Sequence, residues 1–389
     1  MSLSKMLIPL LIFTTILLLI HYYLWTKLVR NVMWPEPWGK ILTISLIVLA
    51  ALIPLVFITM RTAPRALSIP LSWVVYTWIG FLFYLLVFSA LSDAGRGVAA
   101  VIGIHPQDPE RRRFMFRAIA SGVAAAAGLV GLGGILNVAS GFRVRRVNIP
   151  LAKLPAGASG YSIVQLTDVH VGPTLGREFV ESVVKEANAL NPDLIVITGD
   201  LVDGTVEHLR HLVEPLRYLK ARDGVYFVTG NHEYYSGADA WIAHLRTLGV
   251  RVLRNERVDV RGLFTLAGTD DASAARMLPG HGQDVPKATE GHDPSRALVL
   301  LAHQPKTIHE AVKAGVDLQL SGHVHGGQMV PFNWLAHIEQ PFISGLHRMG
   351  ETWIYVSQGT GYWGPPMRVG TRSEITFIEL VSTGEARAS

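Results

Sequence analysis

Four long apolar stretches fill the first 140 residues and constrain the fold of this part more than any other feature. They run over Leu7–Trp25, Ile41–Met60, Pro70–Leu91 and Ala118–Ala139. Each is close to the ~20 residues that a helix needs to cross a ~30 Å hydrocarbon layer. Four such runs without a polar stripe argue against buried helices of a soluble domain. We therefore expect an all-α transmembrane region of about four helices over residues 1–140.

Charge divides unevenly along the chain. Residues 1–149 carry 14 Lys or Arg and 4 Asp or Glu, whereas residues 150–389 carry 21 and 26. The basic residues flank the apolar stretches, and the polar part is mildly acidic. A nucleic-acid-binding domain would gather Lys and Arg on its own surface, so we expect no nucleic-acid partner. The absence of cysteine excludes disulfides and thiolate metal ligands.

The basic run Arg111–Arg113 before the fourth stretch bears on membrane orientation. Together with Phe114 and Met115 it resembles a twin-arginine export signal. An ordinary anchor that follows the positive-inside rule explains the same residues. Both interpretations leave Arg111–Arg113 in the cytoplasm. We therefore expect an integral protein of a bacterial inner membrane whose polar part is extracytoplasmic. It would be joined through a juxtamembrane linker at residues 141–157, which forms either a short strand or a tether.

Residues 158–389 read as one α/β domain. Apolar runs with strand character at 161–167, 193–198 and 224–229 alternate with helical patterns at 176–190, 205–220 and 238–248. Such alternation predicts parallel strands buried on both faces. Shorter strands follow Gly249, so we expect two stacked sheets flanked by helices. Residues 269–294 are rich in Asp, Gly, His and Pro, which predicts a long loop at the rim.

Five short blocks of metal-ligand residues follow one another in this domain. They are Asp168-Val169-His170, Gly199-Asp200-Leu201-Val202-Asp203, Gly230-Asn231-His232-Glu233, the single His303, and Gly322-His323-Val324-His325. The first three close predicted strands, where an α/β sheet places its active site. Any one block could be a plain turn, but their joint order at strand ends indicates a site for two divalent cations. A central carboxylate such as Asp200 is suited to bridge two metals ~3.5–4 Å apart.

This ordered set of blocks resembles the calcineurin-like metallophosphoesterases over roughly residues 158–381. The resemblance implies a four-layer sandwich of two mixed sheets flanked by helices. It assigns one metal to Asp168, His170, Asp200 and His325, and a second to Asp200, Asn231, His303 and His323. It makes His232 the catalytic histidine and Asp203 the carboxylate that orients it. The cofactors would be two divalent ions, chosen among Mn, Fe and Zn.

Further segments resemble a subgroup of that family. The tail from Gly326-Gly327-Gln328 through Ser357–Gly361 to Gly370 resembles membrane-associated bacterial members, and the apolar stretches resemble transmembrane proteins with a metallophosphoesterase domain. Because no ligand of the set is missing, we expect an enzyme and not a binding relic.

The expected function is that of a membrane-anchored dinuclear-metal phosphohydrolase. It would cleave phosphodiester or pyrophosphate bonds with a metal-activated hydroxide, on a phosphate-containing small molecule or a lipid-linked substrate at the bilayer. Two alternatives stay open: a phosphomonoesterase or phosphoprotein phosphatase, and a membrane sensor or transporter with a regulatory hydrolase domain. The apolar segment Pro331–Leu346 is either a lipid-facing lip or packing against the sheet.

Overall fold

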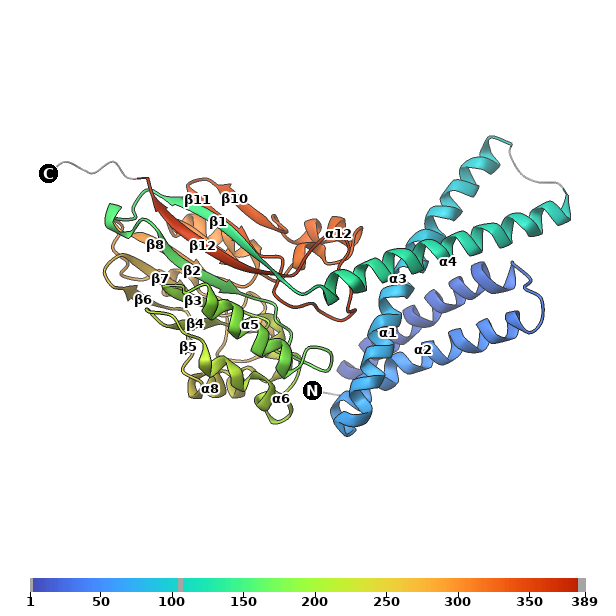
Figure 1. Cartoon of the computed structure of the whole chain (residues 1–389), viewed down its shortest axis with the longest axis horizontal. Coiled ribbons are helices and arrows are strands. Elements are labelled where there is room, and N and C mark those ends of the chain that lie inside the picture. The colour runs from blue at the N-terminus through green and yellow to red at the C-terminus, as the bar shows by residue number, and fades with distance from the viewer. Residues whose placement is uncertain (1–2, 104–107, 384–389) are drawn as a thin grey trace. The chain divides into compact units, whose positions relative to one another are not determined.

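The computed structural model describes residues 3–103 and 108–383 (Figure 1). Residues 1–2 and 384–389, which begin and end the expected ranges 1–140 and 158–389, lie outside the described residues. The chain divides into two compact units. The helical unit comprises Met1–Leu136 with Gly364–Met367, and the sheet unit comprises Asn137–Trp363 with Arg368–Ser389.

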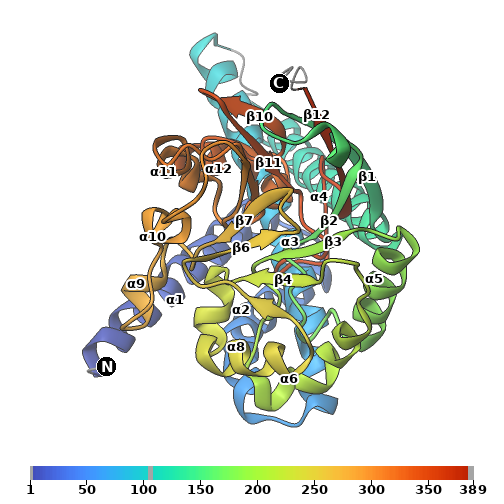
Figure 2. The same cartoon turned by 90° about the vertical axis from the view of Figure 1, so that its left-hand side faces the viewer.

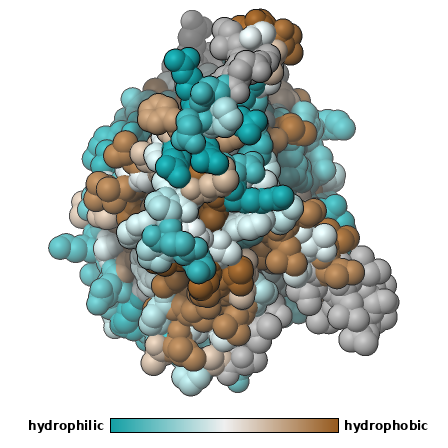
Figure 3. Space-filling model, turned by 90° about the vertical axis from the view of Figure 1, so that its right-hand side faces the viewer, coloured by the Kyte–Doolittle hydropathy of each residue, from teal (hydrophilic) through white to brown (hydrophobic). Residues whose placement is uncertain are grey.

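Long apolar helices make up the helical unit: α1 (Leu3–Trp25), α2 (Trp38–Thr62), α3 (Arg65–Val101) and α4 (Pro109–Ala139). A π-helical turn, η1 (Thr26–Arg30), extends α1. All four are long and apolar enough to cross a membrane, as the four stretches predicted. Many large hydrophobic side chains of this unit are exposed, and Figure 3 shows broad hydrophobic areas beside hydrophilic ones on one face of the molecule.

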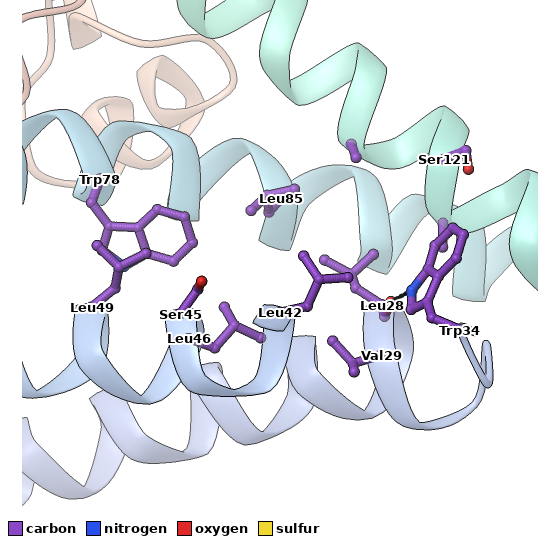
Figure 4. Close-up of a pocket in the computed structure, with 12 residues that line it drawn as sticks. Leu28, Val29, Trp34, Leu42, Ser45, Leu46, Leu49, Trp78, Leu85 and Ser121 are labelled. Atoms are coloured by element: carbon purple, nitrogen blue, oxygen red, sulfur yellow. Dashed lines mark hydrogen bonds between the residues drawn. The ribbon is translucent and has the colours of Figure 1, made fainter. Parts of the chain in front are cut away.

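An apolar cavity of about 380 Å³ lies among these helices (Figure 4). Trp78 and Trp34 stand near its two ends, and the Trp34 indole N–H donates to the carbonyl of Leu28 at 2.7 Å. The remaining lining residues are Val29, Leu42, Ser45, Leu46, Leu49, Leu85, Ala120, Ser121 and Ala124. Such a lining suits hydrocarbon groups, because an ion would lose its hydration there without gaining polar partners.

Two six-stranded mixed sheets form the sheet unit. The first has the order β1-β12-β2-β3-β4-β5, built from β1 (Arg143–Leu151), β12 (Glu374–Ser382), β2 (Tyr161–Leu166), β3 (Leu194–Thr198), β4 (Val225–Val228) and β5 (Arg251–Val252). The second has the order β10-β11-β9-β8-β7-β6, built from β10 (Gly345–Met349), β11 (Thr352–Val356), β9 (Leu318–Ser321), β8 (Ala297–Leu301), β7 (Phe264–Gly268) and β6 (Glu256–Val260). Strands β2 to β5 are parallel, and so are β7, β8, β9 and β11.

Helices cover the outer faces of both sheets, which gives four layers (Figure 2). On the first sheet lie α5 (Arg177–Ala189), α6 (Val206–Val213) and α8 (Ala238–Thr247); on the second lie α10 (Val285–Thr289) and α11 (Ile308–Lys313). Side chains alternate across β3: Ile195 and Ile197 pack against the helices, whereas Leu194 and Val196 enter the core between the sheets. The predicted pair of sheets flanked by helices is confirmed.

Shorter elements fill the connections. They are η2 (Ala156–Ala158), η3 (Glu214–Tyr218), α7 (Asn231–Ser236), α9 (Ala274–Met277), η4 (Pro305–Thr307), η5 (His325–Gly327) and α12 (Phe332–Glu339). Helices α9 and α10 lie inside the expected loop at 269–294. The helix expected at 205–220 is α6 followed by the 3₁₀ turn η3, because Pro215 has no N–H to continue the α-helical bonding.

The segment expected as a linker at 141–157 contains a full strand. β1 pairs in parallel with β12 over nine residues, from Arg143 opposite Glu374 to Leu151 opposite Ser382. The sheet therefore extends further toward the N-terminus than residue 158. A short strand was one of the two forms expected for this segment, and its arginines at 143, 145 and 146 lie on an edge strand of the first sheet.

Packing between the sheets predicts a large stability effect at Phe264. Its ring is fully buried and meets the ring of Tyr161 edge-on at 5.1 Å. Replacing it by alanine should lower the free energy of unfolding by about 3–5 kcal/mol. Thermal unfolding of Phe264→Ala and of the exposed control Tyr218→Ala checks this. Equal unfolding temperatures for both variants would contradict the assignment of Phe264 to the inter-sheet core.

Candidate metal centre

All predicted site residues follow the carboxyl ends of parallel strands. In the first sheet Asp168 and His170 follow β2, Asp200 and Asp203 follow β3, and Asn231 and His232 follow β4. In the second sheet His303 follows β8, and His323 and His325 follow β9. Ligand-type atoms from both sheets lie within 4.8 Å of one another, in the groups Asp168–His170–His325 and Asp200–His303–His323. The site is therefore shared between the sheets.

The first group is buried and tied to the second sheet through Asp168. Both carboxylate oxygens of Asp168 accept the backbone N–H of His323 at 3.0 Å, and Oδ2 also accepts the Thr167 hydroxyl at 2.7 Å. Asp168 Oδ1 lies 3.4 Å from His325 Nε2, which lies 3.0 Å from His170 Nε2. A carboxylate and two imidazoles thus converge on one point.

Asp200 and His303 define the second group. His303 Nδ1 lies 2.7 Å from the carbonyl of Thr198, which can only accept, so Nδ1 carries the hydrogen. The Nε2 lone pair then faces Asp200 Oδ2 at 3.0 Å. Two lone pairs at this distance repel unless a proton or cation lies between them. Burial lowers the pKa of His303, but the Asp200 carboxylate outweighs it and raises that pKa well above its usual range.

Three buried atoms around this group accept no hydrogen bond within the described part of the chain. They are Asn231 Oδ1, His303 Nε2 and His323 Nδ1. Each comes from a different strand end, and an orphaned buried acceptor costs free energy unless something binds it. An amide oxygen, imidazoles and a carboxylate form a donor set that suits Mn, Fe or Zn. The second group therefore fits a divalent cation.

Asp203 connects His170 with His232. Its Oδ1 accepts from Nδ1 of His170 at 3.0 Å and from Nδ1 of His232 at 2.6 Å. Each ring therefore directs Nε2 away from Asp203, and His232 Nε2 lies 4.0 Å from Asp200 Oδ2. Burial lowers the pKa of His232, but Asp200 and Asp203 outweigh it and raise the pKa to about 9. These two carboxylates therefore favour the protonated form of the His232 imidazole.

The backbone at the strand ends is unusual. Five of the seven predicted ligands have positive φ: Asp168, His170 and Asp200 at 51°, His323 at 73° and His325 at 53°. Non-glycine residues seldom adopt this conformation, which costs of order 1–3 kcal/mol each and concentrates at functional sites. The sharp turns direct carboxylates and imidazoles back over the strand ends.

Two glycines permit close approach to these carboxylates. A Cβ on Gly322 would overlap Asp168 Oδ2 and Thr167 Oγ1, and one on Gly230 would overlap Asp200 Oδ1. A glycine before Asn231 and a glycine before His323 are therefore steric requirements of these two turns.

Arg368 is a buried cation beside the site that no sequence motif marked. Its Nη2 donates to the carbonyls of Gln358 and Gly361, both at 2.7 Å, and to His325 Nδ1 at 3.0 Å. Because arginine can only donate, His325 Nδ1 accepts this bond, and Nε2 is the ring nitrogen that faces His170 Nε2 at 3.0 Å. Burial lowers the Arg368 pKa to about 10, so it stays charged. It positions the His325 ring.

Glu233 belongs to the third block but had no expected role. It is fully buried, and its Oε2 accepts backbone N–H groups of Gly230 at 2.7 Å and Asp200 at 3.0 Å, while Oε1 accepts that of Leu201 at 2.8 Å. One side chain thereby locks the turns after β3 and β4 together. Its position at the end of the block Gly230-Asn231-His232-Glu233 was the sequence signal that could have indicated a role for Glu233.

Two exposed aromatic side chains flank His232. The ring of Tyr235 lies 5.2 Å and that of Trp363 lies 5.7 Å from the imidazole, both edge-on. They offer apolar faces directly beside this imidazole.

Comparison with known proteins shows which family and which relatives this chain resembles. Residues 161–327 match the family model described as calcineurin-like phosphoesterase. A Danio rerio protein named transmembrane protein with metallophosphoesterase domain is 36% identical over 398 residues, covering 95% of this chain and 88% of that protein. Its Bos taurus namesake is 38% identical over 390 residues, covering 94% and 87%. A solved structure of a putative 5'-nucleotidase from Staphylococcus aureus gives a TM-score of 0.35 at 15% identity, covering 59% of this chain and 55% of that one.

The overlap at Gly322 predicts a steric effect on metal binding. Gly322→Ala should displace the Asp168 carboxylate and lower the bound divalent metal per chain at least several-fold. Gly157→Ala is the matched control, because a Cβ there meets nothing within 4 Å. Metal content by mass spectrometry after dialysis, with a circular dichroism spectrum to confirm folding, checks the pair. Unchanged metal content in a folded Gly322→Ala protein would contradict this role.

Proposed function

Because this chain belongs to the calcineurin-like phosphoesterase family and is a metal-dependent phosphoesterase, we propose that it is a membrane-anchored hydrolase of phosphodiester or pyrophosphate bonds. The observation that carries the proposal is the convergence of buried acceptor atoms from both sheets, with the His232 imidazole held beside them by Asp203. Carboxylates and imidazoles without a bound cation would leave these acceptors unpartnered.

We assign the cation ligands as the blocks predicted. Asp168, His170, Asp200 and His325 hold the first ion; Asp200, Asn231, His303 and His323 hold the second. Two of the three groups of ligand-type atoms that lie within 4.8 Å support this division. We take Asp200 as the shared carboxylate and add Asn231 through its orphaned oxygen. Two divalent ions, Mn, Fe or Zn, would lower the pKa of a water molecule and neutralise phosphate oxygens when bound.

His232 acts as the general acid. Asp203 holds its Nδ1, so Nε2 with its hydrogen is free to donate to the oxygen that leaves phosphorus. The side chain keeps a small exposed area, which allows substrate to reach it, and the Asp203 carboxylate favours the protonated form of the ring. Asp203 contributes by orientation and charge, since the two imidazoles outweigh burial and hold its own pKa well below the usual range.

The surroundings of His232 support a diester or pyrophosphate over a monoester. Tyr235 and Trp363 would contact a second, apolar or planar, substituent on the phosphate. The guanidinium of Arg368 is committed to carbonyls and to His325, so it does not bind the extra charge of a monoester dianion.

The four apolar helices support a substrate at the bilayer, and a lipid-linked phosphate is the finer proposal. Arg111–Arg113 lie in the first turns of α4 and favour a cytoplasmic position for that end of the helix. On this basis we propose that the sheet unit works on the extracytoplasmic side of a bacterial inner membrane.

The division of roles between Asp200 and His232 can be separated by substitution. Asp200→Asn should lose bound metal and activity together, because this carboxylate serves both ions. His232→Asn should keep its metal while kcat falls about 10²–10⁴-fold, as expected for loss of a general acid. Metal content and kcat of both variants are measured beside His309→Asn, an exposed histidine on α11. Loss of metal from His232→Asn would show that the role assignment is wrong.

The substrate class is tested with two chromogenic esters. We expect kcat/KM for bis-p-nitrophenyl phosphate to exceed that for p-nitrophenyl phosphate at least ten-fold, since the aromatic side chains contact the second substituent. Lipid-linked pyrophosphates extend the same assay, and Asp200→Asn gives the background rate. A preference for the monoester would favour the phosphomonoesterase alternative over this proposal.

A further inference from the structure

We propose that α12 is an interfacial helix, which inserts exposed hydrophobic side chains into the surface of a lipid bilayer. The eight residues of α12 include none that is buried. Trp334 is 72% exposed and Ile338 is 82% exposed, with Phe332 and Leu335 also exposed. Half of this helix is thus large and apolar, and water faces it in the folded protein. Hydrophobic area of this kind, gathered on one short element, marks a binding surface.

The exposure of α12 is not the result of a loose segment, because both ends are held. At its start, Gly327 approaches the backbone of Asn333 so closely that a Cβ would overlap it. After its end, Gln340 is buried and its Oε1 accepts the backbone N–H of Lys306 at 3.0 Å. The Lys306 ammonium also pairs with Glu339 at 2.9 Å. The helix is fixed in place with its apolar side chains outward.

These anchors connect α12 to the site. The turn η5 that precedes it begins at His325, and Lys306 lies three residues after His303. Gln328 exchanges two hydrogen bonds with the backbone of Trp363, donating to its carbonyl at 2.8 Å and accepting its N–H at 3.0 Å. Trp363 stands beside His232. A connected set of contacts therefore links α12 to Trp363 and, through it, to His232.

A lipid surface fits α12 better than a protein does. Trp334 is the residue type that favours the headgroup region, where the ring is buried and the indole N–H stays hydrated. A helix of eight residues is about 12 Å long. Its four side chains offer on the order of 500 Å², below the ~800 Å² per partner of a stable protein interface. Shallow insertion of a short apolar face needs no such area.

A short segment joins β1 to a helix that is long and apolar enough to cross a membrane. Three residues, Ser140–Phe142, separate the end of α4 from the start of β1. An extended chain covers at most ~3.6 Å per residue, so β1 begins within about 15 Å of the end of a helix that can cross a membrane. Resting on the proposed function, this surface would let the site receive a phosphate that stays anchored in the membrane.

Depth of insertion is measurable because the chain has no cysteine, so one introduced thiol is unique. Ile338→Cys and the control Tyr218→Cys, which is 60% exposed on η3, are spin-labelled in the full chain and placed in phosphatidylcholine–phosphatidylglycerol nanodiscs. We expect the label at 338 to collide several-fold more with oxygen than with a nickel chelate, and the label at 218 to show the reverse. Equal, water-like accessibility at both positions overturns the proposal. Dipolar broadening between copies at 338 also overturns it, since a second copy would then cover α12.

Activity gives a second measurement that separates docking from catalysis. In Trp334→Ser combined with Ile338→Ser, hydrolysis of soluble bis-p-nitrophenyl phosphate should be unchanged. Hydrolysis of a phosphodiester lipid carried in vesicles of the same two lipids should fall at least ten-fold. Equal rates on the vesicle substrate overturn the role of α12 in substrate access. Failure of the unmodified protein on the soluble diester would instead reject the proposed function, while the depth measurement at 338 remains decisive for docking.

Discussion

Pairing of buried carboxylates with imidazoles from other strands is the constraint on which the rest of the sheet unit depends. Asp200 faces His303 across the two sheets, and Asp203 holds His170 and His232 together. A buried ion without a partner costs several kcal/mol, so the strand ends must meet closely enough to supply one. The stacked sheets bring the partners together, and the left-handed turns aim them.

Residues outside the ligand set keep that arrangement rigid. Glu233 binds the turns after β3 and β4 through backbone N–H groups, and Arg368 binds His325 to the loop after β11. Each is a buried polar side chain whose hydrogen bonds go to backbone groups and, for Arg368, to one ring. Buried polar groups of this kind specify a geometry, since any displacement leaves several of them unpaired.

The chain has two kinds of apolar surface, which differ in length. The long helices of the helical unit are apolar over lengths that suit the full hydrocarbon layer. The short helix α12 is apolar over about two turns and is held at both ends by contacts that lead back to His303 and His325. A helix rises only ~1.5 Å per residue, so the eight residues of α12 are too short to cross a bilayer and could insert only into its surface. Both surfaces are compatible with a phosphoesterase site kept at a lipid surface.

Local patterns in the sequence were sufficient for the four apolar helices, most strands and the ligand blocks. Helix length and strand periodicity are properties of neighbouring residues, and each block directly follows a strand. Contacts between distant residues were not accessible in this way. β1 is a strand because it pairs with β12, more than 200 residues later, and Arg368 is a site residue because its partner His325 lies 43 residues earlier.

The segment Pro331–Leu346 left two interpretations open, and only the fold assigned its residues: Phe342 packs on the core of the second sheet, while Trp334 and Ile338 face outward. In the sequence, an apolar residue that packs in the core cannot be told from one that is exposed at the surface. Tertiary packing alone decides which side chains are covered.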